Sequence, residues 1–314
     1  MSDMNSTVST AVSPGKFILL GEHAVVYGKP AVALAIDMPF SCSVTASDHN
    51  SLNGIPIDVN RHPHIQYIFS RLNVNNLSIS TWSDIPSGSG LGSSAALSTS
   101  LDAAIRNMTD QDMDLVEIAK DSFEAEYYAQ GKASPLDTST CTFGNGIAIN
   151  VDDPDTHLWE AKKEDGRWLV SKTDIPEMTF VIGYTGIKAP TKPLVEKVRK
   201  YKEHNRFASE VIDEIELITR QGIKDMKRND VVALGRIMTK NHKLLSILGV
   251  SCNELNKLVN ATERHSYGAK LTGSGGGGCM IALTDEPEMV CEDIRLHGGV
   301  PYIVKTGVAG VTII

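Results

Sequence analysis

Three glycine-rich segments constrain this chain more than any other feature of its sequence. They are PGKFILLGEHAVVYGKP at residues 14–30, PSGSGLGSSAA at 86–96 and AKLTGSGGGGC at 269–279. Each lies beside an apolar run that is typical of a strand. Glycine lacks Cβ and tolerates positive φ, so successive backbone N–H groups in such loops can converge on an anion. The pattern predicts an enzyme that handles phosphate groups.

Length, net charge and cysteine content limit the classes of protein to which this chain can belong. A chain of 314 residues is long enough for about two domains. Its net charge of −8 disfavours nucleic acid as a partner, because no basic face compensates for it. The five cysteines are odd in number and none forms a C-x-x-C pair, which indicates reduced thiols and a cytoplasmic protein.

The sequence offers no membrane segment. The apolar run at residues 31–36 is far too short to span a bilayer. Residues 1–12 have neither the basic region nor the apolar region of a signal peptide, and we expect them to form a disordered leader.

The order of the predicted elements divides the chain in two. We expect strands at 16–20, 31–36, 41–47 and 77–82, with helices at 62–71, 93–108 and 112–130. From residue 178 we expect a strand to 184, helices between 192 and 268, strands at 269–272 and 279–284, a helix at 287–297 and a strand at 301–306. The second block is a β-α-β-β-α-β plan with extra helices, which places two domains at 13–175 and 176–314.

The second glycine-rich segment is the strongest chemical signal. Its N–H groups and the positive end of the following helix predict an anion site, in which a serine hydroxyl can reach Mg²⁺. The segment is neither a Walker A loop nor a Rossmann fingerprint, and a serine-capped turn is the structural alternative. The predicted ATP-binding residues are Pro86, Ser87, Gly88, Ser89, Gly90, Leu91, Gly92, Ser93 and Ser94.

In this order and spacing, PGKFILLGEH, GLGSSAA and KLTGSGGGGC resemble the three signatures of the GHMP kinases. The resemblance covers the chain from about residue 13 to its end. Within that group, GEHAVVYGKPA and the run MTKNHKLLSILGVS at 238–251 resemble the mevalonate kinase family.

The resemblance assigns roles to particular residues. Lys16 and Asp137 match the catalytic pair beside the substrate hydroxyl, and Glu22 and His23 match the substrate-binding pair. In the metal site, Ser94 and Glu126 match the magnesium ligands, with Ser93 as the alternative to Ser94. One segment departs from the family: residues 130–137 read QGKASPLD, where mevalonate kinases usually have H-G-x-P-S-G-x-D.

Local signals around Asp137 agree with the assignment. Ser134 is a good N-cap and Pro135 a good first helical residue, which puts Asp137 at the third helical position. The alternative is a capping acid without a catalytic role. A similar pattern predicts a capping box at Ser251 and Glu254. For residues 62–64, an exposed helix start is favoured over a metal-binding histidine pair.

The resemblance implies an α+β protein with the two-domain GHMP kinase fold. The N-terminal domain would resemble the second domain of ribosomal protein S5, and the C-terminal domain would be ferredoxin-like. ATP, Mg²⁺ and mevalonate would meet in the cleft between them, giving 5-phosphomevalonate for isoprenoid synthesis. Two alternatives stay open, a sister GHMP kinase for another small hydroxy compound and a non-catalytic nucleotide sensor. The sequence also leaves the oligomeric state open, with a homodimer among the alternatives.

Overall fold

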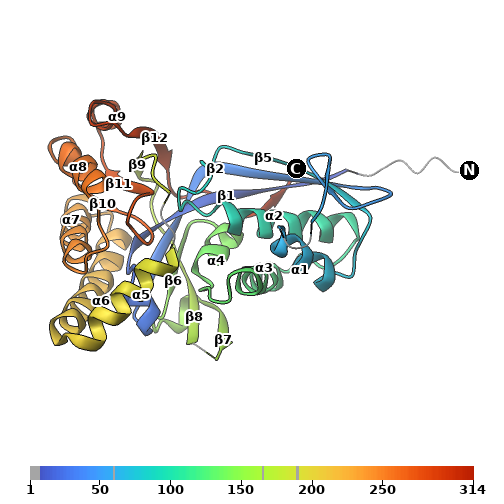
Figure 1. Cartoon of the computed structure of the whole chain (residues 1–314), viewed down its shortest axis with the longest axis horizontal. Coiled ribbons are helices and arrows are strands. Elements are labelled where there is room, and N and C mark those ends of the chain that lie inside the picture. Colours follow the sequence, from blue (N-terminus) through green and yellow to red (C-terminus); the bar gives the residue numbers. More distant parts are fainter. Residues whose placement is uncertain (1–7, 59–60, 165, 189–190) are drawn as a thin grey trace, which may run out of the picture.

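The computed structural model describes residues 8–58, 61–164, 166–188 and 191–314, which form two β-sheets with helices packed on them (Figure 1). The strands of the larger sheet are β1 (Ser9–Leu20), β2 (Ala31–Ala46), β3 (Ser51–Leu52), β4 (Ile55–Pro56), β5 (Leu77–Ser83), β6 (Gly146–Ile149), β7 (His157–Lys163), β8 (Gly166–Thr173) and β13 (Thr312–Ile313). Its helices are α1 (Pro63–Arg71), α2 (Ser93–Met108), α3 (Leu115–Gln130) and α4 (Leu136–Phe143).

The larger sheet is mixed. Its main path runs β4-β3-β5-β2-β6-β8-β7, while β1 pairs with β2 and with β13. The β3–β5 pairing is parallel and the other pairings are antiparallel. Helix α2 packs across β1 and β2 and against α3 and α4, so the strand that carries the first glycine-rich segment faces the helix that follows the second one.

The smaller sheet belongs to the second half of the chain. Its strands are β9 (Thr179–Tyr184), β10 (Gly268–Leu271), β11 (Cys279–Leu283) and β12 (Val300–Lys305), in the antiparallel order β10-β11-β9-β12. The helices are α5 (Thr191–His204), α6 (Arg206–Lys227), α7 (Val231–Ile247), α8 (Asn253–Ala261) and α9 (Pro287–Leu296). Strand, helices, two strands, helix and strand in this order confirm the predicted ferredoxin-like plan.

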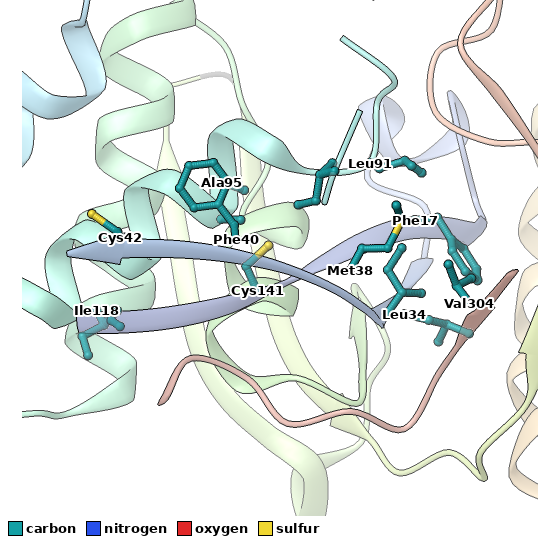
Figure 2. Close-up of a cluster of buried hydrophobic side chains, with 14 of the residues drawn as sticks. Phe17, Leu34, Met38, Phe40, Cys42, Leu91, Ala95, Ile118, Cys141 and Val304 are labelled. Atoms are coloured by element: carbon teal, nitrogen blue, oxygen red, sulfur yellow. The ribbon is translucent and has the colours of Figure 1, made fainter. Parts of the chain in front are cut away.

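The hydrophobic core is continuous between the two sheets. The rings of Phe17 on β1 and Phe180 on β9 have their centroids 4.9 Å apart. Figure 2 shows Phe17 beside Val304 of β12, and all three side chains are buried in the same cluster. Because apolar side chains of both sheets pack in one core, the two halves of the chain hold a fixed geometry at their junction.

Several local expectations differ from the structure. The two strands predicted at 31–36 and 41–47 form one strand, β2, in which Pro39 pairs opposite Pro14 of β1. Neither proline has an N–H to donate to the ladder, and the register of β1 and β2 shifts directly after this pair, between Pro14 and Gly15. The leader predicted for 1–12 is wrong from Ser9 onward, where β1 pairs with β2 and β13; residues 1–7 lie outside the described residues.

Other elements were not predicted. The hairpin β7–β8 and the short strands β3, β4, β6 and β13 have no counterpart in the expected elements. The capping box at Ser251 and Glu254 is wrong, because Cys252 holds the N-cap of α8 and the Ser251 hydroxyl donates to Asn256 Oδ1 at 2.6 Å. The sheets change between β8 and β9, and the domain limits stay a prediction. Within the described ranges, every helix is too short or too polar to cross a membrane.

Candidate active site

A cleft of about 230 Å³ lies where the three glycine-rich segments meet. The first segment lines it with Lys16, Glu22 and His23, and the second with residues 88–90. The third contributes residues 272–275 and 277–278, and Asp137 of α4 completes the lining together with the start of α5. The predicted substrate-binding residues and part of the predicted ATP loop therefore share one cavity.

Lys16 is held from two sides in the cleft. It lies on β1, only 3% exposed, and its Nζ is 2.8 Å from Asp137 Oδ2. The same ammonium donates to the carbonyl of Gly90 at 3.2 Å, and the backbone N–H of Lys16 donates to the carbonyl of Leu91 at 3.0 Å. These contacts fix the lysine between the second glycine-rich segment and the Asp137 carboxylate, which is 41% exposed toward the cleft.

The second glycine-rich segment connects β5 to the N-terminus of α2. Gly88, Gly90 and Gly92 have φ angles of 72°, 82° and 87°, which only glycine adopts without strain. The Ser89 hydroxyl donates to the Pro86 carbonyl at 2.7 Å and closes the turn. Among the other predicted ATP-binding residues, Ser87 is exposed, the Leu91 side chain is buried away from solvent, and Ser93 and Ser94 begin α2.

Ser94 and Glu126 lie together beside this loop. The Ser94 hydroxyl donates to Glu126 Oε1, and the Gln130 side-chain amide donates to Glu126 Oε2. His64 Nε2 lies 3.4 Å from both Ser94 Oγ and Glu126 Oε1, so the prediction of an exposed start of α1 is wrong for His64. A hydroxyl and a carboxylate that converge in this way are suitable ligands for Mg²⁺, which prefers oxygen donors.

Aromatic packing fixes the helix that presents Glu126. The Phe123 ring on α3 makes edge-to-face contacts with Trp159 of β7 and Trp168 of β8, at 6.1 Å between centroids in each case. Such contacts add stabilisation to the burial of the rings themselves. Because Glu126 follows Phe123 by about one helical turn, this packing sets where its carboxylate points.

An ionic network around the buried side chains of Asp102, Arg106 and Asp121 connects the helices that carry the metal-site candidates. Arg106 of α2 donates to Asp102 at 2.6 Å and to Asp121 of α3 at 2.7 Å, and Arg71 of α1 donates to Asp121 at 2.6 Å. Burial raises the pKa of Asp102 to about 7, and Arg106 opposes the shift. The network ties α1, α2 and α3, which carry His64, Ser94 and Glu126 respectively.

Glu22 and His23 follow β1 in a strained turn. His23 has a φ of 61°, a left-handed conformation that is rare for residues other than glycine. Its Nε2 lies 3.0 Å from the carbonyl oxygen of Ser274, so Nε2 carries the hydrogen, and burial lowers the pKa of the ring. The Glu22 carboxylate is 2% exposed and forms an ion pair with Lys270 of β10.

Asp137 occupies a different helical position from the predicted one. Helix α4 begins at Leu136 with Pro135 as its N-cap, so Ser134 is not the cap and Asp137 is the second helical residue. Its carboxylate still lies in the first turn, where the helix dipole stabilises an anion. The correction leaves the side chain beside Lys16.

Sequence reasoning missed Thr272 in the lining of the cleft and two lysines next to it. Lys270 and Thr272 belong to the third glycine-rich segment; the Thr272 hydroxyl donates to the Ile18 carbonyl at 2.8 Å. The side chain of Lys188 lies over Gly88, where an added Cβ would be 3.1 Å from its Cδ and Cε. A lysine inside an apolar strand was the available signal for Lys270; no comparable signal marked Lys188.

Comparison with known proteins identifies relatives among the GHMP kinases. Two family models match: GHMP kinases N terminal domain over residues 62–145, and GHMP kinases C terminal over residues 223–294. The mevalonate kinase of Thermococcus onnurineus is 32% identical over 345 residues, covering 96% of this chain and 97% of the relative.

Solved structures of mevalonate kinases have a fold similar to that of this chain. Methanococcus jannaschii mevalonate kinase is 26% identical, with a TM-score of 0.79 over 98% of this chain and 100% of that one. The L. major mevalonate kinase in complex with R-mevalonate is 22% identical, with a TM-score of 0.84 over 99% of both chains. At that identity the second likeness concerns the fold alone.

Proposed function

The chain belongs to the mevalonate kinase family of the GHMP kinases, and from this membership we propose that it phosphorylates the primary hydroxyl of mevalonate with ATP. The products are 5-phosphomevalonate, an intermediate of isoprenoid synthesis, and ADP. The observation that carries the proposal is the 2.8 Å ion pair of Lys16 and Asp137 at the meeting point of the three glycine-rich segments.

Asp137 is the residue proposed to receive the proton. In the reaction the mevalonate hydroxyl oxygen attacks the γ-phosphorus, the bond to the β-phosphate oxygen breaks, and the hydroxyl proton passes to the Asp137 carboxylate. Phosphoryl transfer has a loose transition state, so a carboxylate that orients the hydroxyl and takes its proton late is sufficient. The partial exposure of this carboxylate in the cleft leaves it accessible to the acceptor.

Lys16 is proposed to stabilise charge on the transferred group. Its ammonium is held by Asp137 and the Gly90 carbonyl, at the loop proposed to bind the phosphates. A preorganised cation that is already desolvated stabilises developing charge without a reorganisation cost at the moment of reaction. The residues 86–94 supply N–H groups and the α2 dipole to the same phosphates.

The site fits a magnesium ion. Glu126 offers a carboxylate and Ser94 a hydroxyl, and these two residues would hold Mg²⁺ together with water and the nucleotide. The ion, when bound, neutralises charge on the β- and γ-phosphate oxygens. Ser94 is favoured over Ser93, because its hydroxyl reaches the Glu126 carboxylate.

The state of the cysteines supports a proposal about where in the cell the protein acts. All five cysteines, each within the described residues, are free thiols, and Cys42, Cys141 and Cys279 are fully buried. Reduced thiols are the normal state in the cytoplasm, which we propose as the location.

A coupled ADP-release assay tests the function. Mevalonate, phosphomevalonate, homoserine, galactose and shikimate are compared as acceptors at saturating ATP. Mevalonate should give the highest kcat/KM by at least about 100-fold, because a site built to pair polar groups rejects analogues that lack them. Comparable turnover of galactose or homoserine would overturn the proposal.

A further inference from the structure

An ion pair joins the two halves of the chain directly behind the cleft. Lys270 on β10 is 0% exposed, and its ammonium donates to Glu22 Oε1 across 248 residues of sequence. An unpaired charge at such depth is very costly, so each partner depends on the other. Among the described residues, Glu22 is the ion-pair partner that the structure gives to Lys270.

Among the residues that the structure describes, no second carboxylate forms an ion pair with Lys270. His242 of α7 lies close by, because Gly235 and Gly268 let α7 pack directly on β10; a Cβ on Gly268 would be 1.9 Å from the Gly235 carbonyl oxygen. His242 Nδ1 accepts the backbone N–H of Leu271 at 3.2 Å, which leaves the ring proton on Nε2. The ring is therefore held in its neutral form, and the compensating negative charge comes from Glu22.

Glu22 and His23 each have one buried acceptor atom that receives no hydrogen bond from the described residues. Glu22 lines the cavity, and its Oε2 is buried without a hydrogen-bond partner. His23 lines the same cavity, and its Nδ1 is also buried without a partner. Since His23 Nε2 donates to Ser274, Nδ1 is an acceptor. The two neighbouring residues thus offer two unused acceptors, and buried groups of this kind normally have a partner.

We propose that Lys270 is a positioning residue for the phosphoryl acceptor: by engaging Glu22 Oε1, it fixes Glu22 as an anion whose Oε2 accepts a hydrogen bond from a substrate hydroxyl. The inference rests on the proposed function, which supplies a substrate with two hydroxyl groups. Charges then alternate from the interior to the cleft in the order Lys270, Glu22, Lys16, Asp137. Burial raises the pKa of Glu22, and the ammonium groups of Lys270 and, more weakly, Lys16 oppose that rise. Glu22 therefore depends on Lys270 to stay ionised.

A purely structural ion pair between the domains is the competing explanation, and it makes a different prediction. Replacing a buried pair by neutral groups is often neutral or stabilising, whereas removing one partner alone is destabilising. A structural role therefore affects unfolding and leaves substrate affinity alone. A positioning role affects the affinity for mevalonate selectively.

The experiment compares wild type, Lys270→Met, Glu22→Gln and the double variant in full-length protein. It measures kcat, KM for mevalonate, KM for ATP, the mevalonate dissociation constant by calorimetry and the thermal midpoint. Lys270→Met should raise the KM and dissociation constant of mevalonate by about 10- to 100-fold, the range for a hydrogen bond to a charged group, and change the KM for ATP by less than about 3-fold. In the Glu22→Gln background, Lys270→Met should add less than about 3-fold.

Leu271→Ala is the matched control, because Leu271 is a neighbour on the same strand, fully buried in the apolar core. It should lower the thermal midpoint with both KM values unchanged. If Lys270→Met behaves like this control, or if the two single effects multiply in the double variant, the inference is wrong. Should Lys270→Met fail to fold, the double variant decides: mevalonate affinity equal to that of Glu22→Gln supports the inference, and a further loss overturns it. Wild type without mevalonate turnover would overturn the proposed function, and this is visible before any variant is compared.

Discussion

Gly92 and Lys16 approach each other so closely that a Cβ on Gly92 would lie 2.7 Å from Cγ of Lys16. Gly92 also has a φ of 87° and holds the N-cap of α2. Because Gly92 has no Cβ, the N-terminus of α2 packs directly on the aliphatic part of the Lys16 side chain. This packing determines the position of the Lys16 ammonium group.

Gly92→Ala should therefore displace Lys16 and lower kcat by at least about 10-fold. The left-handed backbone should also cost alanine about 1–2 kcal/mol of stability. Gly54→Ala is the control, since Gly54 has a φ of 78° with open space around its Cβ position. It should cost similar stability and leave kcat unchanged. Equal kinetics in the two variants would contradict the role given to the Gly92 contact. Stopped-time product assays and urea unfolding measure the two effects.

Asp137→Asn tests the proposed base. Asparagine keeps the shape and fits the first turn of α4, but it has neither the charge nor the proton affinity of the carboxylate. We expect kcat to fall by about 10²–10⁴-fold, with ATP and mevalonate binding changed much less. Near-wild-type turnover would show that Lys16 and proximity suffice, and early melting of the variant would favour a structural role for Asp137.

Glu126→Gln tests the proposed metal site. The amide keeps the size of the side chain on α3 but is a much poorer ligand for a hard cation. The magnesium concentration for half-maximal rate should rise by about 10-fold or more, and kcat should fall. Glu124→Gln, on the same helix and paired with Lys163 at its surface, should leave the magnesium titration unchanged. An unchanged titration for Glu126→Gln would mean that another group holds the ion.

The elements with strong local signals could be predicted from the sequence. Asp230 caps α7 through Ala233 N–H, and Gly131 ends α3 in the left-handed conformation, as their residue types indicate. The short strands β6 and β13 could not be predicted, because β6 has four residues and β13 has two, too few to show a hydrophobic alternation. They exist through pairing with β2, β8 and β1, which the local pattern does not contain.

The same limit applies to the candidate site. The glycine-rich segments located Lys16, Glu22 and the phosphate loop, since each lies inside a recognisable motif. The partner of Glu22 was missed because Lys270 lies 248 residues away in the sequence. The two residues form an ion pair only because the fold buries them side by side, which the local pattern does not contain. His64 was placed on the surface for a related reason: its contact with Glu126 depends on how α1 packs on α3.

His242 should make stability depend on pH. Burial, with Lys270 as a second cause, lowers the pKa of His242 to about 4 from its ordinary 6.5. The folded state then binds fewer protons than the unfolded state between these values, so stability present above pH 6.5 is lost as the pH falls toward 4. By pH 5 the loss should be about 2 kcal/mol from this group. His242→Asn places an amide oxygen near the position of Nδ1, where it can accept the Leu271 N–H, and it does not titrate. Urea unfolding at pH 7.5 and pH 5 should show a smaller decrease for the variant than for wild type by about this amount; equal decreases would mean that His242 is protonated as easily in the folded chain as in the unfolded one.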